Sequence, residues 1–256
     1  MFLACDLGNT FVKMGVYDGS RLIKFFKKDY NSFQEIQLGG FGINEAAVSS
    51  VVPTRTVNVA SFVKGQCGID PYIITRKSLL NIRINYLTPN TLGIDRICSL
   101  EGALSLFNEG SPLRKSWENV FIITVDLGTA TTINVLKYHD GFTGGIIAPG
   151  LKTMARSLNS NTSELPEIDL ISDYNGFWGR DTRSSIASGI IHSTICLIER
   201  AVKNIETDNH SSEIWIYATG GNSDFIKPHL KLNNLNYVQG LVLYGVKSIY
   251  ERNRSL

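Results

Sequence analysis

The alternation of apolar and polar residues predicts the same strand–turn–strand pattern twice along the chain. Residues 2–19, FLACDLGNTFVKMGVYDG, and 120–141, VFIITVDLGTATTINVLKYHDG, each contain an apolar strand, an Asp-x-Gly turn, a second strand and another turn at Asp-Gly. Asp6 and Asp126 begin the two Asp-x-Gly turns. The repeat divides the chain into two halves, and the irregular segment 110–118 is the expected boundary between two domains.

The spacing of apolar residues predicts further elements in both halves. A short buried strand is expected at 46–52, where Pro53 ends it, and 214–221 is expected to be a strand that runs into a glycine turn. Residues 93–96, Gly-Ile-Asp-Arg, should lie at or near a helix N-terminus. Helices are predicted over 91–107, 149–159, 180–206 and 239–253.

Composition and charge narrow the class of protein. The 256 residues are 43% hydrophobic and 19% charged, which is typical of a folded, soluble α/β protein. The net charge is only +2 and the basic residues are scattered, so neither nucleic acid nor a membrane is an expected partner. The expected partner is a small molecule. The N-terminus has no basic leader and Asp6 interrupts its apolar stretch, so the expected location is the cytoplasm.

Cysteines and histidines give no sign of a metal site. The four cysteines lie far apart without a CxxC pair, so we expect them to be reduced and mostly buried, and we expect no zinc. The four histidines are remote from one another and belong to no nucleophile or metal motif. Ordinary surface or core roles are therefore expected for all of them.

The two Asp-x-Gly turns are the candidate chemistry of the chain. Asp supplies a carboxylate for a hydrated cation, Gly lets the backbone approach a phosphate, and Asn, Thr and backbone N–H groups donate to phosphate oxygens. The chain lacks GxxxxGK[ST], and Gly40-Phe-Gly42 lacks the third glycine of a dinucleotide fingerprint. A single Asp-x-Gly turn could equally be a plain tight hairpin, but two copies, each followed by Thr, favour a polyphosphate held from both sides.

Several motifs occur in an order and spacing that one known family shares. The motifs are DLGNT at 6–10, SSVVP at 49–53, TPNTLGIDR at 88–96, DLGTATT at 126–132, GGIIAPGL at 144–151 and TGG at 219–221. By these motifs the chain resembles type III pantothenate kinases over its whole length. Asp-x-Gly-Asn alone is shared by the actin-like, Hsp70 and sugar-kinase superfamily, whereas LGxDR followed by DxGTATT is far more specific.

The resemblance implies a fold and an ATP site. The implied fold is α/β, with two duplicated actin-like (ribonuclease H-like) domains, 1–115 and 116–256, whose mixed sheets are flanked by helices and which bind ATP between them. Asp126 matches a monovalent-cation ligand of the family, and Thr129 matches a second ATP contact. Oxygen-rich loops of this kind suit potassium and magnesium better than softer metals. Lys13 could instead be a solvated surface residue. The first ATP-binding stretch is Asp6, Leu7, Gly8, Asn9, Thr10, Phe11, Val12 and Lys13.

The resemblance also implies a catalytic residue and an acceptor site. Asp95 matches the aspartate that accepts the proton of the pantothenate hydroxyl during attack on the γ-phosphorus, although a helix N-cap carboxylate is the alternative. Arg96 could equally be a surface arginine. Thr182 matches a threonine that reaches the pantothenate in the family, from its own or from the partner subunit, whereas the residues alone favour an N-cap role for it. The implied substrate-binding residues are Tyr86, Gly93, Ile94, Asp95, Arg96 and Thr182.

The implied activity is phosphorylation of pantothenate by ATP to 4′-phosphopantothenate, the first step of coenzyme A biosynthesis. Mg²⁺ with ATP, a monovalent cation (K⁺ or NH₄⁺) and a cytoplasmic homodimer belong to this expectation. Two alternatives stay open: a non-catalytic regulatory protein on the same scaffold, and a kinase for another small hydroxylated acceptor. One departure from the pattern, Asn222 after the TGG glycines, makes nucleotide affinity less certain.

Overall fold

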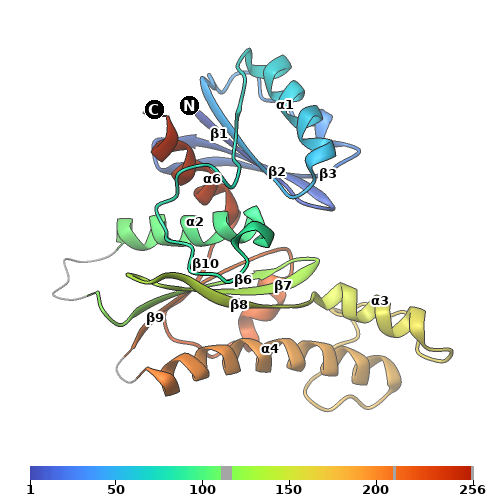
Figure 1. Ribbon diagram of the computed structural model, residues 1–256. Helices are drawn as coiled ribbons and strands as arrows, with labels where there is room; N and C mark the ends of the chain where they lie inside the picture. Colours follow the sequence, from blue (N-terminus) through green and yellow to red (C-terminus); the bar gives the residue numbers. More distant parts are fainter. Residues whose placement is uncertain (111–116, 210–211, 255–256) are drawn as a thin grey trace. The chain divides into compact units, whose positions relative to one another are not determined.

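The structure, a computed structural model, describes residues 1–110, 117–209 and 212–254 and groups them into two compact units (Figure 1). The described residues of 1–115, 140–143 and 240–256 form unit 1, and those of 116–139 and 144–239 form unit 2. The last helix and a four-residue segment of the second half thus pack with the first half. The division into two duplicated domains, 1–115 and 116–256, stays a prediction. Most of the boundary expected at 110–118 lies outside the described residues.

Unit 1 is built on a mixed sheet with strand order β3-β2-β1-β4-β5. The strands β1, β2 and β3 are antiparallel neighbours, whereas β4 and β5 run parallel to β1. Two 3₁₀ helices, η1 (Phe33–Glu35) and η2 (Pro89–Thr91), lie in its loops. The strands are β1 (Phe2–Leu7), β2 (Phe11–Asp18), β3 (Arg21–Asp29), β4 (Glu45–Ser50) and β5 (Tyr72–Ile73).

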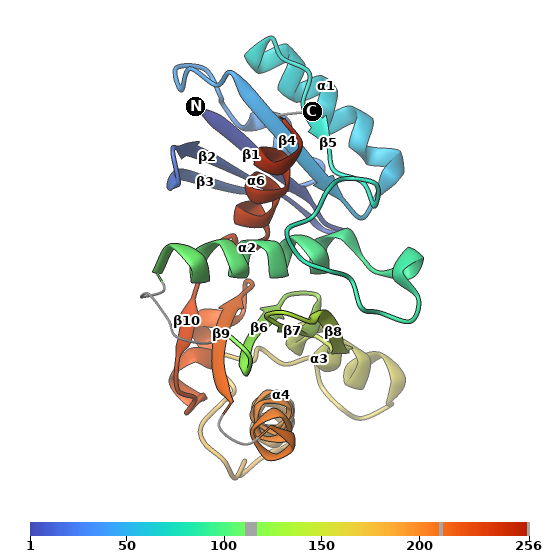
Figure 2. The ribbon, with the colours of Figure 1, turned by 60° about the vertical axis from the view of Figure 1, so that its left-hand side comes forward.

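Three helices cover the two faces of this sheet: α1 (Pro53–Cys67), α2 (Ile94–Gly110) and α6 (Leu241–Asn253). Because successive residues of a strand point to opposite faces, every second residue of β1 packs in the core with α1, while α6 lies against the other face (Figure 2). Pro53 starts α1, since its fixed φ suits the first helical position, and Gly68 ends it with φ 73°. The core residues facing α1 include Leu3, Cys5, Leu7, Val12, Met14, Val16, Val59 and Val63.

Unit 2 repeats this arrangement. Its sheet has the order β10-β9-β6-β7-β8, in which β6 pairs antiparallel with β7 and parallel with β9, as β1 does with β2 and β4. The strands are β6 (Val120–Leu127), β7 (Ala130–Lys137), β8 (Gly141–Pro149), β9 (Glu213–Thr219) and β10 (Leu235–Tyr237). Its helices are α3 (Leu151–Asn161), α4 (Thr182–Asp208), α5 (Ser223–Ile226) and η3 (Lys227–His229). The predicted duplicated fold with mixed sheets flanked by helices is confirmed.

The long helix α4 forms the core of unit 2 together with one face of the sheet. Ile190, Ile191 and Ile195 are buried against alternate residues of β6 and β9. By length and composition alone α4 could cross a membrane, a test that the core helices of soluble proteins also pass. Its N-cap is Asp181, whose carboxylate accepts from the Ser184 N–H at 3.0 Å, so the alternative that Thr182 is the cap is wrong.

The expectation that the cysteines are reduced and mostly buried is only partly right. All four are free. Cys5 on β1 and Cys98 on α2 are buried, and burial raises the pKa of both thiols. Cys67 is half-buried at the end of α1 and Cys196 is exposed on α4, because these positions lie at the margins of the two cores.

Helices α2 and α6 pack with their backbones in direct contact. A Cβ on Gly245 would lie inside the van der Waals radius of the Cys98 backbone, and one on Gly102 would do the same with the Leu241 carbonyl oxygen. The two glycines therefore allow an approach that no larger residue permits.

We predict that Gly245→Ala destabilises the protein by about 1–3 kcal/mol, the usual cost of overpacking a core. Urea unfolding followed by circular dichroism measures the change. Gly65→Ala in α1, where a Cβ meets nothing within 4 Å, is the matched control and should be neutral or stabilising by about 0.5–1 kcal/mol. Equal stability of the two variants would show that the α2–α6 contact is not close.

Candidate active site

The first Asp-x-Gly turn joins β1 to β2 as a tight hairpin. The Gly8 N–H donates to the Phe11 carbonyl oxygen at 3.0 Å, and Asn9 and Thr10 are exposed at the tip of the turn. Arg55, at the start of α1, donates to the Asn9 carbonyl oxygen at 3.3 Å. The hairpin and the phosphate-binding interpretations are therefore compatible, because the turn leaves donor groups accessible at its tip.

Asp6 is a buried carboxylate with two partners. It is 4% exposed and lies on the sheet face opposite α1, directly across from Lys13 on β2 and Ser49 on β4. Ser49 Oγ donates to Asp6 Oδ1 at 3.1 Å, and Lys13 Nζ lies 3.5 Å from Asp6 Oδ2. Lys13 is thus ion-paired rather than only solvated. Ser49, known from the sequence only as part of the SSVVP motif, supplies the hydroxyl that holds Asp6.

Other residues of the predicted ATP-binding stretch point elsewhere. The side chains of Leu7 and Val12 are fully buried in the core beneath α1, so only their backbone could contact a ligand. Lys27 Nζ lies 4.2 Å from the centre of the Phe11 ring. Of the side chains in 6–13, those of Asp6, Asn9, Thr10 and Lys13 are the ones that the fold makes available for polar contacts.

Asp95 lies in the first turn of α2, close to Asp6. Burial raises the pKa of its carboxyl, and the negative charge of Asp6 raises it further. Hydrogen bonds from the backbone N–H groups of Arg96 and of Asp95 itself oppose this rise. A Cβ on Gly93 would collide with Asp95 Oδ1, so the glycine makes room for the carboxylate to fold back over the helix start. Ile94, between them, is buried.

Arg96 is buried beside two aromatic rings rather than exposed. It is 8% exposed, and its guanidinium carbon lies 5.3 Å from the centre of the Phe142 ring and 5.8 Å from that of Tyr86. The two rings lie 5.2 Å apart. The alternative of a surface arginine is therefore wrong. Phe142 was not among the predicted site residues, because nothing in its sequence position next to Gly141 indicates that it joins a loop of the first half.

Glu101 anchors the loop that carries Tyr86. This carboxylate of α2 is fully buried and accepts hydrogen bonds from the backbone N–H groups of Asn81 and Ile82 at 2.6 and 3.1 Å. The Asn81 amide donates to its other oxygen at 2.9 Å, and Ser248 of α6 donates to the same oxygen at 3.3 Å. The beginning of the loop is therefore fixed to the helix that also carries Asp95 and Arg96.

In unit 2, three glycine-containing segments meet at the second Asp-x-Gly turn. The Gly128 N–H donates to the Ala130 carbonyl oxygen at 3.1 Å, and the Gly150 N–H donates to that of Thr129 at 3.0 Å. A Cβ on Gly128 or Gly220 would press on Asp126 Oδ1, with 3.2 and 2.7 Å between them. The carboxylate therefore lies in a cradle that only glycine leaves open, and Thr129 is exposed beside it.

Asn222 and the neighbouring threonines have structural roles at this turn. The Asn222 N–H and its side-chain amide both donate to the Leu127 carbonyl oxygen at 3.2 Å. Asn222, the residue that departs from the family pattern, thus fastens the TGG segment to the turn. Thr131 and Thr132 lie on β7 in register with Leu127 and Asp126, as expected for strand residues.

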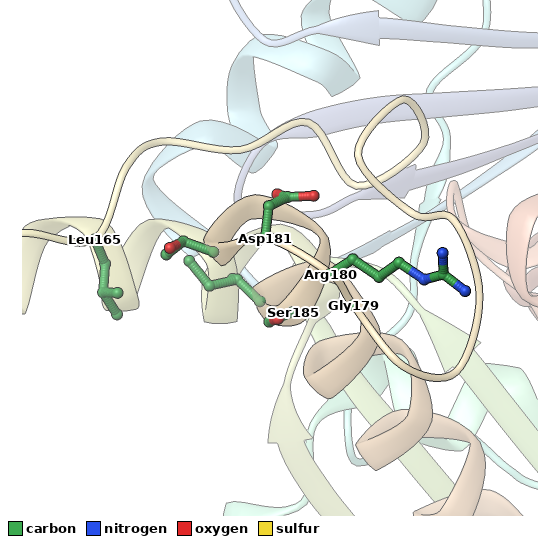
Figure 3. Close-up of a pocket in the computed structure, with 7 residues that line it drawn as sticks. Leu165, Gly179, Arg180, Asp181 and Ser185 are labelled. Carbon is green, nitrogen blue, oxygen red and sulfur yellow. The ribbon is translucent and has the colours of Figure 1, made fainter.

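Thr182 is at the first turn of α4 in unit 2. It is exposed and borders an open depression of about 570 Å³ in unit 2 (Figure 3). The loop that leads into it is held by Arg183, whose guanidinium makes two contacts of 3.1 Å with the Asp173 carboxylate. The residues around the depression are Leu165, Gly179, Arg180, Asp181, Thr182, Ser185 and Ile186.

The candidate site residues described above therefore fall into three groups. Unit 1 brings together Asp6, Lys13, Asp95, Arg96 and Tyr86, whereas unit 2 carries Asp126 with Thr129 and, separately, Thr182. Throughout 1–110, 117–209 and 212–254 there is no group of three or more His, Cys, Asp or Glu side chains that could hold a metal ion unaided. Any cation at these carboxylates would need further ligands from water or phosphate.

The raised pKa of Asp95 predicts a pH-dependent cost to stability. Below the carboxyl pKa of the unfolded chain both states are protonated and nothing is lost; as pH rises through the higher folded pKa, the folded protein must ionise a buried group and loses stability. Asp95→Asn should therefore raise Tm at pH 7–8, with a gain that shrinks toward pH 4. Thermal melts of both proteins across this range test it; a variant less stable than wild type at neutral pH would contradict it.

Sequence comparison places the chain among known enzymes. The family model for type III pantothenate kinases matches residues 2–204. A type III pantothenate kinase of Sulfurihydrogenibium sp. is 30% identical, with 96% of this chain and 98% of the relative covered. One of Geobacter sulfurreducens is 28% identical, with 99% and 100% covered. The chain is thus similar to these relatives over nearly the full length of both.

Solved structures with low sequence identity share the fold. An archaeal actin homologue aligns with a TM-score of 0.51 at 13% identity over 98% of this chain and 99% of its own. An ethanolamine utilization protein of Carboxydothermus hydrogenoformans aligns with a TM-score of 0.50 at 12% identity, over 96% and 89%. These likenesses support the actin-like architecture of the two sheets. From the match over residues 2–204 together with the full-length relatives, we conclude that the chain belongs to the type III pantothenate kinase family.

Proposed function

We propose that this protein transfers the γ-phosphoryl group of ATP to pantothenate, giving ADP and 4′-phosphopantothenate, in the first step of coenzyme A biosynthesis. The observation that carries the proposal is the pair of neighbouring carboxylates in unit 1, Asp6 and Asp95, in a chain of this family. One is fixed at an Asp-x-Gly turn and the other lies beside a buried arginine. A phosphate-binding turn next to a proton acceptor is what transfer to an alcohol requires.

Each Asp-x-Gly turn offers, in this proposal, contacts to ATP. Gly8, Asn9 and Thr10 offer backbone N–H groups and side-chain donors to phosphate oxygens at the tip of the first turn, and Lys13 adds positive charge. Thr129 plays the matching role at the second turn. The close backbone approach that Gly128, Gly150 and Gly220 permit supports a phosphate contact there.

Two kinds of cation accompany ATP. Asp126 is the proposed ligand of a monovalent ion, K⁺ or NH₄⁺, and the glycine cradle around its carboxylate fits a hard cation that takes further oxygen ligands from backbone or water. Asp6 offers a carboxylate to the hydration shell of Mg²⁺. When bound with ATP, Mg²⁺ neutralises charge on the phosphates.

Asp95 accepts the proton of the pantothenate hydroxyl. Its raised pKa makes it a stronger proton acceptor than an ordinary aspartate, although it is still too weak to create a free alkoxide. In a loose phosphoryl-transfer transition state, orientation of the hydroxyl and late proton transfer are sufficient. Arg96, Tyr86, Gly93 and Ile94 bind the acceptor around it, and the guanidinium supplies directed donors to its polar groups.

The proposed reaction is tested with purified protein, ATP, Mg²⁺ and K⁺. Wild type should phosphorylate pantothenate, and Asp95→Asn should lower kcat by about 10²–10⁴-fold, the usual contribution of a general base. Circular dichroism of the variant controls for folding. Omission of K⁺ and NH₄⁺ should lower the rate.

Each alternative function gives its own result in this assay. Phosphorylation of a sugar but not of pantothenate would identify a kinase for another acceptor. Absence of turnover with every acceptor, despite ATP binding, would favour a regulatory protein without catalysis.

We further propose a cytoplasmic homodimer that acts on small molecules rather than on nucleic acid or membranes. The loop before α4 exposes Ile171, Phe177 and Trp178, and Trp178 is 82% exposed. An apolar groove of about 510 Å³ lies nearby between α3 and α4. Exposed apolar residues next to a groove are typical of a protein interface, and they flank Thr182, the candidate for a shared substrate contact.

Subunit mixing tests whether Thr182 serves the partner's site. Asp95→Asn and Thr182→Ala should each be nearly inactive alone. If each site takes Asp95 from one subunit and Thr182 from the other, a heterodimer holds one intact site, so mixing after mild dissociation should restore up to about a quarter of the wild-type rate, because statistical mixing makes half of the dimers heterodimers. No recovery, with heterodimers present by native mass spectrometry, would assign Thr182 to its own subunit's site.

A further inference from the structure

Residues 140–143 form a short segment of the second half that packs with unit 1 ahead of α6. They follow β7 in the chain and open β8 (Gly141–Pro149), whose later residues belong to unit 2. Within this segment Phe142 is fully buried. A buried aromatic residue in a segment that leaves its own half of the chain needs a partner surface, and that surface is the loop carrying Tyr86.

Backbone hydrogen bonds fix Phe142 to this loop. The Phe142 N–H donates to the Arg83 carbonyl oxygen at 2.8 Å, and the Asn85 N–H donates to the Phe142 carbonyl oxygen at 3.1 Å. Ile84 and Phe142 form a parallel β-bridge. Gly141 has φ 96°, and a Cβ there would collide with the Arg83 backbone, so the approach depends on glycine.

The Phe142 ring contacts two of the proposed acceptor-binding residues. It lies 5.2 Å from the Tyr86 ring at an interplanar angle of 35°, and the Arg96 guanidinium carbon lies 5.3 Å from its centre. An arginine side chain has several rotatable bonds, whereas the Phe142 ring is fully buried on a backbone fixed by two hydrogen bonds. The attraction between the guanidinium and the ring face therefore restricts where Arg96 points.

We propose that Phe142 is a positioning residue for the acceptor: it holds the Arg96 guanidinium and the Tyr86 ring where they bind pantothenate. This inference rests on the proposed function. Phe142 acts through Arg96 and Tyr86, so its loss should weaken acceptor binding without affecting ATP. Glu101 also anchors this loop, through Asn81 and Ile82, just before the Arg83 and Asn85 backbone that pairs with Phe142.

The test compares two phenylalanine-to-leucine changes in unit 1. Phe142→Leu should raise KM for pantothenate about tenfold, from loss of the cation–π and ring contacts, and leave KM for ATP within about twofold. Phe107→Leu is the control: Phe107 is 1% exposed in the last part of α2, about 16 Å along the helix from Arg96, and should change neither KM. Melting temperatures of both variants measure the general cost of a smaller core residue.

A double-mutant cycle shows whether Phe142 acts through Arg96. In an Arg96→Met background, Phe142→Leu should raise KM for pantothenate far less than tenfold, because the guanidinium it positions is gone. Independent, multiplying effects would overturn the proposal, and so would a Phe142→Leu enzyme whose KM values match those of Phe107→Leu. If wild type does not phosphorylate pantothenate, the proposed function falls and this inference with it; if wild type is active, only the inference is at stake.

Discussion

A carboxylate at the end of a buried strand must be given donors or open space, and both halves of this chain are arranged around that requirement. Asp6 receives a hydroxyl from the neighbouring parallel strand and an ammonium group from the neighbouring antiparallel strand. At Asp126 the backbones of Gly128 and Gly220 approach the carboxylate so closely that a side chain at either position would press on it. In each sheet a central strand is flanked by one antiparallel and one parallel partner, and the aspartate points away from the helix that covers the other face. The phosphate-binding role proposed for the turns therefore depends on how each sheet accommodates a carboxylate.

Helix α2 links this arrangement to the acceptor chemistry. Asp95 and Arg96 occupy its first turn, where the fold places the carboxylate near Asp6 and the guanidinium beside two rings. One and a half turns later Glu101 fixes the start of the loop that returns to Tyr86. A single helix thus sets the positions of a carboxylate, a guanidinium and an aromatic side chain. Its own position depends on contact with α6, which glycines on both helices permit.

Periodicity and the Asp-x-Gly turns are local signals, so they allowed the repeated strands and the principal helices to be predicted, whereas the actin-like fold followed from the family resemblance. The role of Ser49 could not be read in this way, since it depends on parallel pairing between β1 and β4, whose register no local pattern fixes. Phe142 was missed for the same reason: its partners lie in the other half of the chain. The N-cap of α4 was expected at Thr182, whereas the adjacent Asp181, a residue type equally suited to the role, occupies it. Local structure could therefore be predicted from the sequence, whereas contacts between residues far apart in the chain could not.

The packing of α6 against α2 has a consequence for synthesis on the ribosome. Unit 2 lies between these two helices in the chain, so the sheet that carries Asp6 waits for α6 until the whole of unit 2 has been made. During that interval the small apolar face around Gly102 and Cys98 is open to chaperones or to other nascent chains. A premature stop before Gly240 would leave unit 2 whole but would remove α6 from unit 1, the unit that carries Asp6 and Asp95.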